Sequence, residues 1–277
     1  MVIKLYQQLA LALGTWVIRL RISAMKLRPS KQSIKAGARV IDTAEMYGNG
    51  NSEQLVGQAI QNLDRKELFI IDKVLPNNAS SDQLPKSLDA SLARVGTDYF
   101  DLYLYHWRGG IPLPETVKAL QDAQNAGKIR HWGVSNFDLA DMKELLSLPG
   151  GSEVAANEDL YNLGSRGTEF DLQSWQVNQK IPFIAYTPIA QGDRFGQQLT
   201  TNRTIQAIAE EHQATPYQIL LAWTIRSGNV LAIPQTSDPI HAAENVKAGD
   251  IEFTEEELEL IDNSFPKPTN KQPLDIL

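Results

Sequence analysis

The chain has 277 residues, 42% of them hydrophobic and 21% charged, which is typical of a folded globular protein and excludes a disordered chain. It contains no cysteine, so disulfides, thiolate catalysis and sulfur-ligated zinc are excluded, and no metal site is predicted. The net charge of −7 argues against a nucleic-acid partner, and no apolar run is long enough to span a membrane.

The N-terminal segment is basic, because residues 1–41 contain eight Lys or Arg and no Asp or Glu. Lys4 followed by an apolar stretch weakly resembles a secretory signal. Gln7 and Gln8 interrupt that stretch, however, and no small-residue cleavage site follows it. The sequence therefore predicts a cytoplasmic protein.

Short apolar runs recur along the chain, and several lack polar alternation, as do strands buried on both faces of a parallel sheet. One more strand is needed upstream of these runs, and residues 9–15 are the candidate. The seven clear runs are residues 38–42, 67–74, 100–107, 129–135, 153–157, 181–188 and 229–235.

Helical patterns alternate with these runs. Ser52 is a good first cap, and Gly96 and Gly127 are placed to end two of the helices. The predicted helices are residues 52–62, 81–94, 114–128, 140–148, 169–180, 204–213 and 239–248.

Eight strand–helix units without a linker predict one (β/α)8 barrel domain over residues 1–277. Two doubly wound nucleotide-binding domains are the alternative. They would need a G-x-G-x-x-G motif, and Glu53 stands where its third glycine would be, after Gly48 and Gly50. The long gap before the last strand predicts an additional loop or helix after the seventh strand, and residues 255–265 predict an extra C-terminal helix.

Three strand ends of the predicted barrel bear polar side chains, namely Asp42, Lys73 and His106, and Tyr47 follows the first of them. Catalytic residues of such barrels gather at this end of the strands. An ammonium beside a phenol favours the phenolate, so Tyr47 is a candidate general acid, with Asp42 pairing Lys73. With His106 donating a hydrogen bond to the same substrate oxygen, the four residues suit carbonyl reduction.

Each residue also has a structural explanation. Tyr47 would cover a turn, Asp42 would cap one, Lys73 would extend its amine to solvent, and His106 would be a core histidine beside Trp107. The four are stronger together than singly, because one fold brings them to one face.

The stretch IDTAEMYGNGNSEQLVG (41–57) resembles the signature of the aldo-keto reductases, and the similarity extends over nearly the whole chain. The nearest likeness is to the bacterial subgroup that reduces methylglyoxal and related aldehydes. The other matching stretches, in the family's order, are DKV, YHW, GKIRHWGVSNF, YNLGSRG, AYTPIAQG and IPQTSDPIHAAEN.

The resemblance implies a catalytic tetrad of Asp42, Tyr47, Lys73 and His106, with Tyr47 as proton donor. It also implies a nicotinamide coenzyme, NADP with NAD as the alternative, lying extended across the barrel mouth. The implied coenzyme residues are Asp42, Ser135, Asn136 and Glu158 with the stacking Tyr186 at the nicotinamide; Thr187, Pro188, Ile189 and Gln191 at the pyrophosphate; and Ile233, Pro234, Gln235, Thr236, His241, Glu244 and Asn245 at the adenosine.

The chain departs from the family at three places. Gln235 and His241 stand where Lys and often Arg pair with the 2′-phosphate, and Glu158 stands where Gln is common. Residues 17–35 lack the acidic residues of a first helix and contain Pro29, which is explained by divergence or by a frame error. Trp16, just before this segment, and Trp107 are implied substrate-pocket residues.

The predicted function is therefore NAD(P)H-dependent reduction of small aldehydes or 2-oxoaldehydes by a monomer or weak homo-oligomer. The first alternative is a nucleotide-binding regulatory protein, or a catalytically impaired barrel. The second is a barrel isomerase or aldolase that uses Lys73 as a Schiff base. Gly48 and Gly50 are predicted to be turn residues behind Tyr47 rather than a phosphate cradle.

Overall fold

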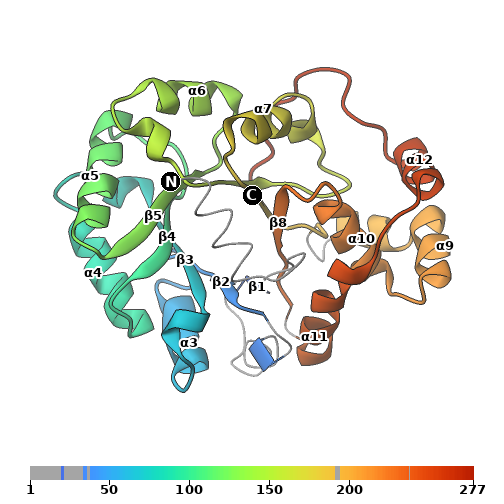
Figure 1. The fold of residues 1–277 in the computed structure, drawn as a ribbon, viewed down its shortest axis with the longest axis horizontal. Helices are drawn as coiled ribbons and strands as arrows, with labels where there is room; N and C mark the ends of the chain where they lie inside the picture. The colour runs from blue at the N-terminus through green and yellow to red at the C-terminus, as the bar shows by residue number, and fades with distance from the viewer. Residues whose placement is uncertain (1–19, 22–33, 36–37, 191–193, 237) are drawn as a thin grey trace.

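The computed structural model describes residues 20–21, 34–35, 38–190, 194–236 and 238–277 (Figure 1). In these ranges, eight parallel strands form one sheet in the order β1 to β8, which curls into a barrel and confirms the predicted fold class. The strands are β1 (Leu20–Arg21), β2 (Val40–Asp42), β3 (Phe69–Val74), β4 (Phe100–Tyr105), β5 (Ile129–Ser135), β6 (Asn157–Leu160), β7 (Phe183–Tyr186) and β8 (Val230–Ile233).

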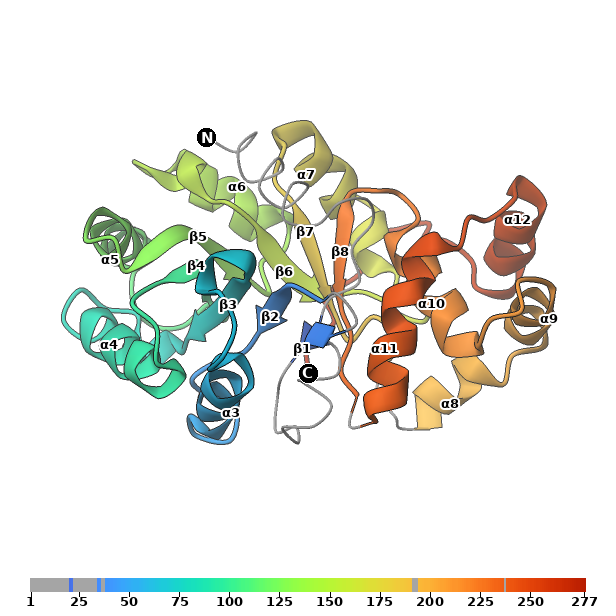
Figure 2. The same cartoon turned by 60° about the horizontal axis from the view of Figure 1, so that its bottom comes forward.

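The helices surround the barrel, with α3 to α6 on one side of it and α8 to α12 on the other (Figures 1 and 2). They are α3 (Asn51–Ile60), α4 (Leu84–Val95), α5 (Leu113–Asn125), α6 (Leu139–Ser147), α7 (Leu172–Gln179), α8 (Arg194–Thr200), α9 (Arg203–Glu211), α10 (Pro216–Ile225), α11 (Pro239–Lys247) and α12 (Glu255–Ser264). An additional loop or helix was predicted after the seventh strand, where α8 to α10 lie, and the predicted extra C-terminal helix is α12.

Alternation along the strands divides the core into two layers. On β3, Phe69 and Ile71 belong to the inner cluster of the barrel, whereas Ile70 and Val74 belong to the outer cluster that packs against the helices. Lys73 lies in register with Leu104 of β4, which is also an inner residue. An ammonium group is therefore carried into the inner layer.

Two predictions of local structure were wrong. The strand predicted at residues 153–157 lies further along the chain, as β6 (Asn157–Leu160), because three of its four residues, Asn157, Glu158 and Asp159, are polar and buried and conceal the apolar pattern. Helix α10 was not predicted at all. It is buried nearly all round, so its sequence has no amphipathic period.

The first strand that the structure describes is β1. Among the described residues, β2 pairs with Leu20–Arg21, inside the segment that fits the family poorly. The predicted strand at residues 9–15 lies outside the described residues, as do Trp16 and Gln191.

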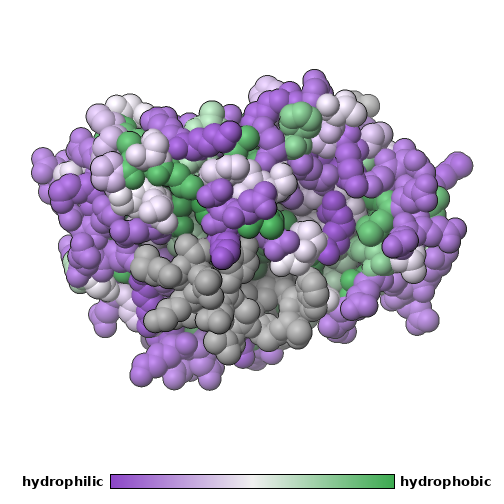
Figure 3. All heavy atoms as spheres, turned by 45° about the horizontal axis from the view of Figure 1, so that its top comes forward, coloured by the Kyte–Doolittle hydropathy of each residue, from purple (hydrophilic) through white to green (hydrophobic). Residues whose placement is uncertain are grey.

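Among the described residues on the face shown in Figure 3, polar side chains predominate, and apolar side chains gather only in small patches. In the described part of the chain, no helix combines the length and apolarity needed to cross a membrane.

Candidate active site

The ends of β2 and β3 bring Asp42 and Lys73 together. Lys73 Nζ lies 2.5 Å from Asp42 Oδ2 and donates a second hydrogen bond, 3.1 Å long, to the carbonyl of Thr43. Both charged side chains are fully buried. Burial of an ammonium in this inner layer is tolerable because the carboxylate is at contact distance.

A second carboxylate contacts the same ammonium from a strand that is not a neighbour of β3 in the sheet. Glu158 Oε1, on β6, lies 3.4 Å from Lys73 Nζ, and its side chain is also buried. One cation is thus shared by two carboxylates, Asp42 and Glu158. The sequence assigned Glu158 to the coenzyme and gave no sign of its contact with Lys73.

Tyr47 and His106 complete this cluster. The Tyr47 ring centre lies 5.4 Å from Lys73 Nζ and 5.7 Å from the His106 ring, nearly perpendicular to it. Trp107 follows, with its ring 4.7 Å from that of His106. Tyr47 and His106 remain 8% and 6% exposed, so both keep some access to solvent at the strand ends.

The loop that carries Tyr47 has an irregular path. Gly48, Asn49 and Gly50 have φ values of 61°, 53° and 86°, in the left-handed region that glycine and asparagine adopt most readily. Helix α3 begins at Asn51, with Gly50 rather than the predicted Ser52 as its N-cap residue, and Ser52 N donates to the carbonyl of Tyr47 at 3.2 Å. The two glycines serve the turn, in agreement with the sequence prediction.

The ends of β5 and β7 add a second group beside the cluster. Asn136 Nδ2 donates to the carbonyl of His106 at 3.0 Å and to Ser135 Oγ at 3.1 Å. Its Oδ1 accepts a hydrogen bond from the Tyr186 hydroxyl at 2.8 Å. Ser135 Oγ donates to the carbonyl of Glu158 at 2.8 Å. Four of the implied coenzyme residues therefore contact one another directly.

The segment after β7 has an unusual backbone. Thr187 and Ala190 have φ values of 53° and 60°. Two side chains hold this backbone in place. Asn162 Nδ2 donates to the carbonyl of Thr187, and Thr224 Oγ1 donates to the carbonyl of Pro188, both at 3.0 Å. This segment leads into a cavity of about 480 Å³ between α10, α11 and the end of β8.

Six of the implied coenzyme residues line this cavity: Ile189, Gln235, Thr236, His241, Glu244 and Asn245. Ile233 does not, because its side chain is buried in the inner barrel layer. The sequence missed Tyr217, whose ring stacks on that of His241 with centres 6.2 Å apart. The Thr215–Gln218 capping box at the start of α10 was the available signal.

Comparisons with known proteins agree with this geometry. The model of the aldo/keto reductase family matches residues 10–265. Methylglyoxal reductase YeaE of Escherichia coli is 42% identical over 97% of this chain and 95% of its own length. Glyoxal reductase of Bacillus subtilis is 34% identical over 84% and 80%.

Solved structures give the same result. An aldo-keto reductase from Klebsiella pneumoniae in complex with NADPH superimposes with a TM-score of 0.91, at 41% identity over 94% of this chain and 95% of that one. A structure from the same organism with NADP and acetate has a TM-score of 0.92 at 40% identity, with the same two coverages. The chain therefore belongs to the aldo/keto reductase family.

Proposed function

We propose that the chain reduces small aldehydes and 2-oxoaldehydes to alcohols with NADPH as coenzyme. The observation that carries this proposal is the convergence of Asp42, Tyr47, Lys73 and His106 at the strand ends. The similar proteins support it, since two are named for methylglyoxal and glyoxal reduction and two similar structures hold NADPH or NADP.

Tyr47 is the proposed proton donor to the carbonyl oxygen of the substrate. The ammonium of Lys73, 5.4 Å from its ring centre, stabilises the phenolate that remains after transfer. Asp42 keeps that ammonium charged by direct contact. His106 orients the substrate oxygen by a hydrogen bond, and Trp107, with Trp16, borders the substrate.

The residues around the 480 Å³ cavity fit the adenosine end of the coenzyme, because a stacked aromatic pair and several polar side chains line it. Bound NADPH supplies the hydride. The side chains proposed to hold its nicotinamide are Ser135, Asn136, Glu158 and Tyr186, which already form a connected group. Thr187 to Ile189, with Gln191, would follow the pyrophosphate, and Gln235 and Thr236, which line the cavity, would border the adenosine.

Preference for NADP over NAD depends on the 2′-phosphate. Gln235 offers it a neutral amide, and His241 offers a ring that is charged only when protonated. NADP is proposed on the strength of the similar structures. The Michaelis constants for NADPH and NADH, measured in parallel, test it, and a clearly lower value for NADH overturns it.

A Schiff-base mechanism at Lys73 is less favoured. The amine must lose its proton to attack a carbonyl, and contacts with Asp42 and Glu158 favour the charged form. Borohydride treatment in the presence of methylglyoxal should therefore leave Lys73 unmodified.

Tyr47→Phe tests the proposed function directly. The variant lacks the transferable proton, and we expect methylglyoxal reduction to fall by about 10²-fold or more. Coenzyme binding, followed by nucleotide fluorescence, should persist. A variant that turns over at nearly the wild-type rate contradicts the assignment. A wild-type chain that binds NADPH without oxidising it in the presence of aldehyde supports the alternative of a binding or regulatory protein.

We also propose a cytoplasmic location and a monomer or weak homo-oligomer that acts on a small carbonyl substrate and binds neither nucleic acid nor a membrane. The net charge of −7 supports the absence of a nucleic-acid partner. Sedimentation of the purified chain tests the oligomeric state.

A further inference from the structure

Glu45 lies in the loop between Asp42 and Tyr47, and its carboxylate connects this loop to its neighbours. Oε1 accepts a hydrogen bond from the backbone N–H of Leu75 at 2.6 Å and another from Asn78 Nδ2 at 3.1 Å. Oε2 accepts one from the hydroxyl of Ser87 on α4. Three donors from two other structural units thus converge on one side chain.

These contacts also involve the strand that carries Lys73. Leu75 follows that lysine by two residues, and the backbone N–H of Glu45 donates to the carbonyl of Lys73 at 3.4 Å. The Glu45 side chain is only partly exposed, and hydrogen bonds to a carboxylate are stronger than those between neutral groups. Glu45 therefore connects the end of β3 with the loop of Tyr47.

The loop needs such a connection because its backbone lies outside any regular element. Residues 48 to 50 have positive φ, and Met46 is 41% exposed beside Tyr47. Thr43 Oγ1 and Ser52 Oγ close the base of the loop with a 2.8 Å hydrogen bond. Glu45 lies between that base and Tyr47, two residues before the tyrosine, so its hydrogen bonds restrict the position of the tyrosine backbone.

We propose that Glu45 is a positioning residue, which fixes the distance between the phenol of Tyr47 and the ammonium of Lys73. The proposal rests on the proposed function in one respect, namely that this distance governs proton transfer. A displacement of about 1 Å at a reacting group costs about 10²-fold in rate. Glu45 acts through Tyr47 and takes no part in the chemistry itself.

Glu45→Ala removes all three contacts. We expect kcat for methylglyoxal to fall by about 10- to 100-fold, with the Michaelis constant for NADPH within about twofold of the wild-type value. Glu45→Gln should recover most of the rate, because its amide oxygen accepts from Leu75 and Asn78 and its NH2 group donates to Ser87.

A matched control is available on the same connection between β3 and α4. Glu115 of α5 accepts a hydrogen bond from the backbone N–H of Ser81 at 3.0 Å and, like Glu45, is partly exposed. Glu115→Ala should leave kcat near the wild-type value. An equal loss in both alanine variants would indicate general loosening of this connection and would overturn the positioning role.

The pH dependence provides a readout that a purely structural role would not move. The ionisable groups around the Tyr47 ring are Lys73 and His106, with Asp42 and Glu158 in contact with Lys73. If the phenol moves away from the ammonium, the loss of kcat at alkaline pH should shift to higher pH in Glu45→Ala.

Nuclear magnetic resonance separates failure of this proposal from failure of the proposed function. In a chain labelled with ¹³C at tyrosine Cζ, Tyr47→Phe identifies the Tyr47 signal without any assay of turnover. That signal should titrate at higher pH in Glu45→Ala than in the wild type, even if the chain reduces no aldehyde. An unchanged titration in a folded Glu45→Ala overturns the proposal.

Discussion

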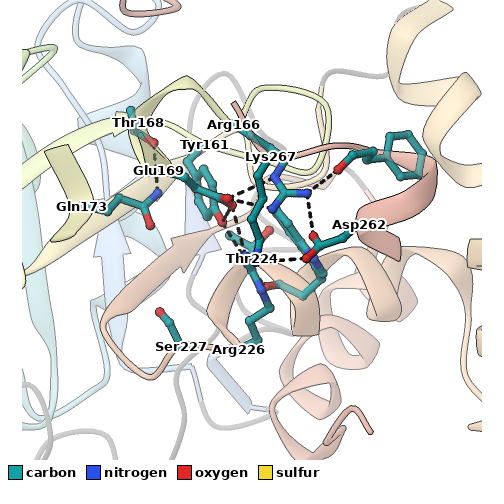
Figure 4. Close-up of polar contacts among 12 residues, drawn as sticks. Tyr161, Arg166, Thr168, Glu169, Gln173, Thr224, Arg226, Ser227, Asp262 and Lys267 are labelled. Atoms are coloured by element: carbon teal, nitrogen blue, oxygen red, sulfur yellow. Dashed lines mark hydrogen bonds and ion pairs between the residues drawn. The ribbon is translucent and has the colours of Figure 1, made fainter. Parts of the chain in front are cut away.

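Two buried ion clusters of this barrel have opposite characters. Around Lys73, one ammonium serves two carboxylates from different strands, and Asp42 Oδ1 has no hydrogen-bond partner among the described residues. The other cluster, drawn in Figure 4, is centred on Arg166, in the loop after β6. There the guanidinium groups and carboxylates are extensively bonded.

The contacts of this second cluster are numerous. Arg166 bonds to Glu169 at 2.7 and 3.1 Å and to Asp262 of α12 at 2.9 Å. Arg226 bonds to Glu169 at 3.1 Å and to the Tyr161 hydroxyl at 2.9 Å. The cluster thus joins the loop after β6 to α10 and α12, elements far apart in the sequence (Figure 4).

The difference separates structural from chemical use of buried charge. A network in which each arginine bonds to more than one partner stabilises the packing of distant segments. A cluster with a shared cation and an unpaired oxygen is costly to bury, and such costs are typically kept where the charges do chemistry. Four tests address this contrast.

Lys73→Met should have the largest effect. Without the ammonium, the Tyr47 phenolate loses its stabilising charge, and we expect kcat to fall by about 10²- to 10⁴-fold. NADPH binding, measured by fluorescence on the folded protein, should be reduced far less. Retention of more than a tenth of the wild-type kcat would contradict a catalytic role for this cluster.

Arg166→Met tests the other side of the contrast. Removal of one member of a buried ion network should lower the free energy of unfolding by about 3–5 kcal/mol, because Glu169 and Asp262 lose their main partner. Urea unfolding measures this loss. The kcat of the folded fraction should stay near the wild-type value, and a loss of kcat as large as in Lys73→Met would erase the distinction.

Parallel strands with alternating helices were predictable from the sequence because buried strands and amphipathic helices leave regular patterns. The polar residues at the ends of those strands could be predicted as well. Asp42, Lys73 and His106 each lie near the position at which an apolar run stops. Local pattern failed at β6 and α10, where polar residues are buried or a helix is apolar on all sides.

Contacts across the barrel could not be predicted in the same way. The approach of Glu158 to Lys73 and the three hydrogen bonds of Glu45 join residues 30 to 85 positions apart, which no local period encodes. Tyr217 was missed together with the helix that carries it. Residues 9–15, Trp16 and Gln191 lie outside the described part of the chain, and their roles stay predictions.

Glu169→Gln should show a pH-dependent loss of stability. Burial raises the pKa of Glu169, but hydrogen bonds from Arg166 and Tyr161 outweigh it and hold the pKa below its usual value. A lowered folded pKa means that the stabilisation is present at neutral pH and is lost as pH falls through that value. We expect the variant to lose about 1–3 kcal/mol at pH 7 in urea unfolding.

This loss should shrink as pH falls below the usual carboxyl range and through the lowered folded value, because the wild-type carboxyl then becomes protonated too. The control is Glu144→Gln, which removes an exposed carboxylate paired with Arg108 on the surface. Exposed pairs contribute little, so its unfolding midpoint should not change measurably. A loss in Glu169→Gln that stays constant from pH 7 down to the most acidic pH at which the wild type is still folded would show that charge is unimportant there.

The smallest effect is expected at Asp72, which precedes Lys73 on β3 and faces the outer layer. Burial, with the nearby carboxylate of Glu53, raises the pKa of Asp72 well above its usual range and outweighs the influence of Lys73. Burial and the charge of Asp72 likewise raise the pKa of Tyr103, its neighbour in register on β4. In the described structure, neither Asp72 oxygen has a hydrogen-bond partner.

The sign is opposite to that at Glu169. A raised folded pKa means that the stabilisation is complete below the usual carboxyl range and is lost as pH rises through the folded value. Asp72→Asn removes this loss, so its melting temperature should match the wild type near pH 4 and exceed it by on the order of a few degrees at pH 7.5. Asp122→Asn, at an exposed site on α5, should show no such trend. If Asp72→Asn is instead destabilised equally at every pH, then Asp72 contributes through its shape and contacts, and unsatisfied charge is confined to the Lys73 side of β3.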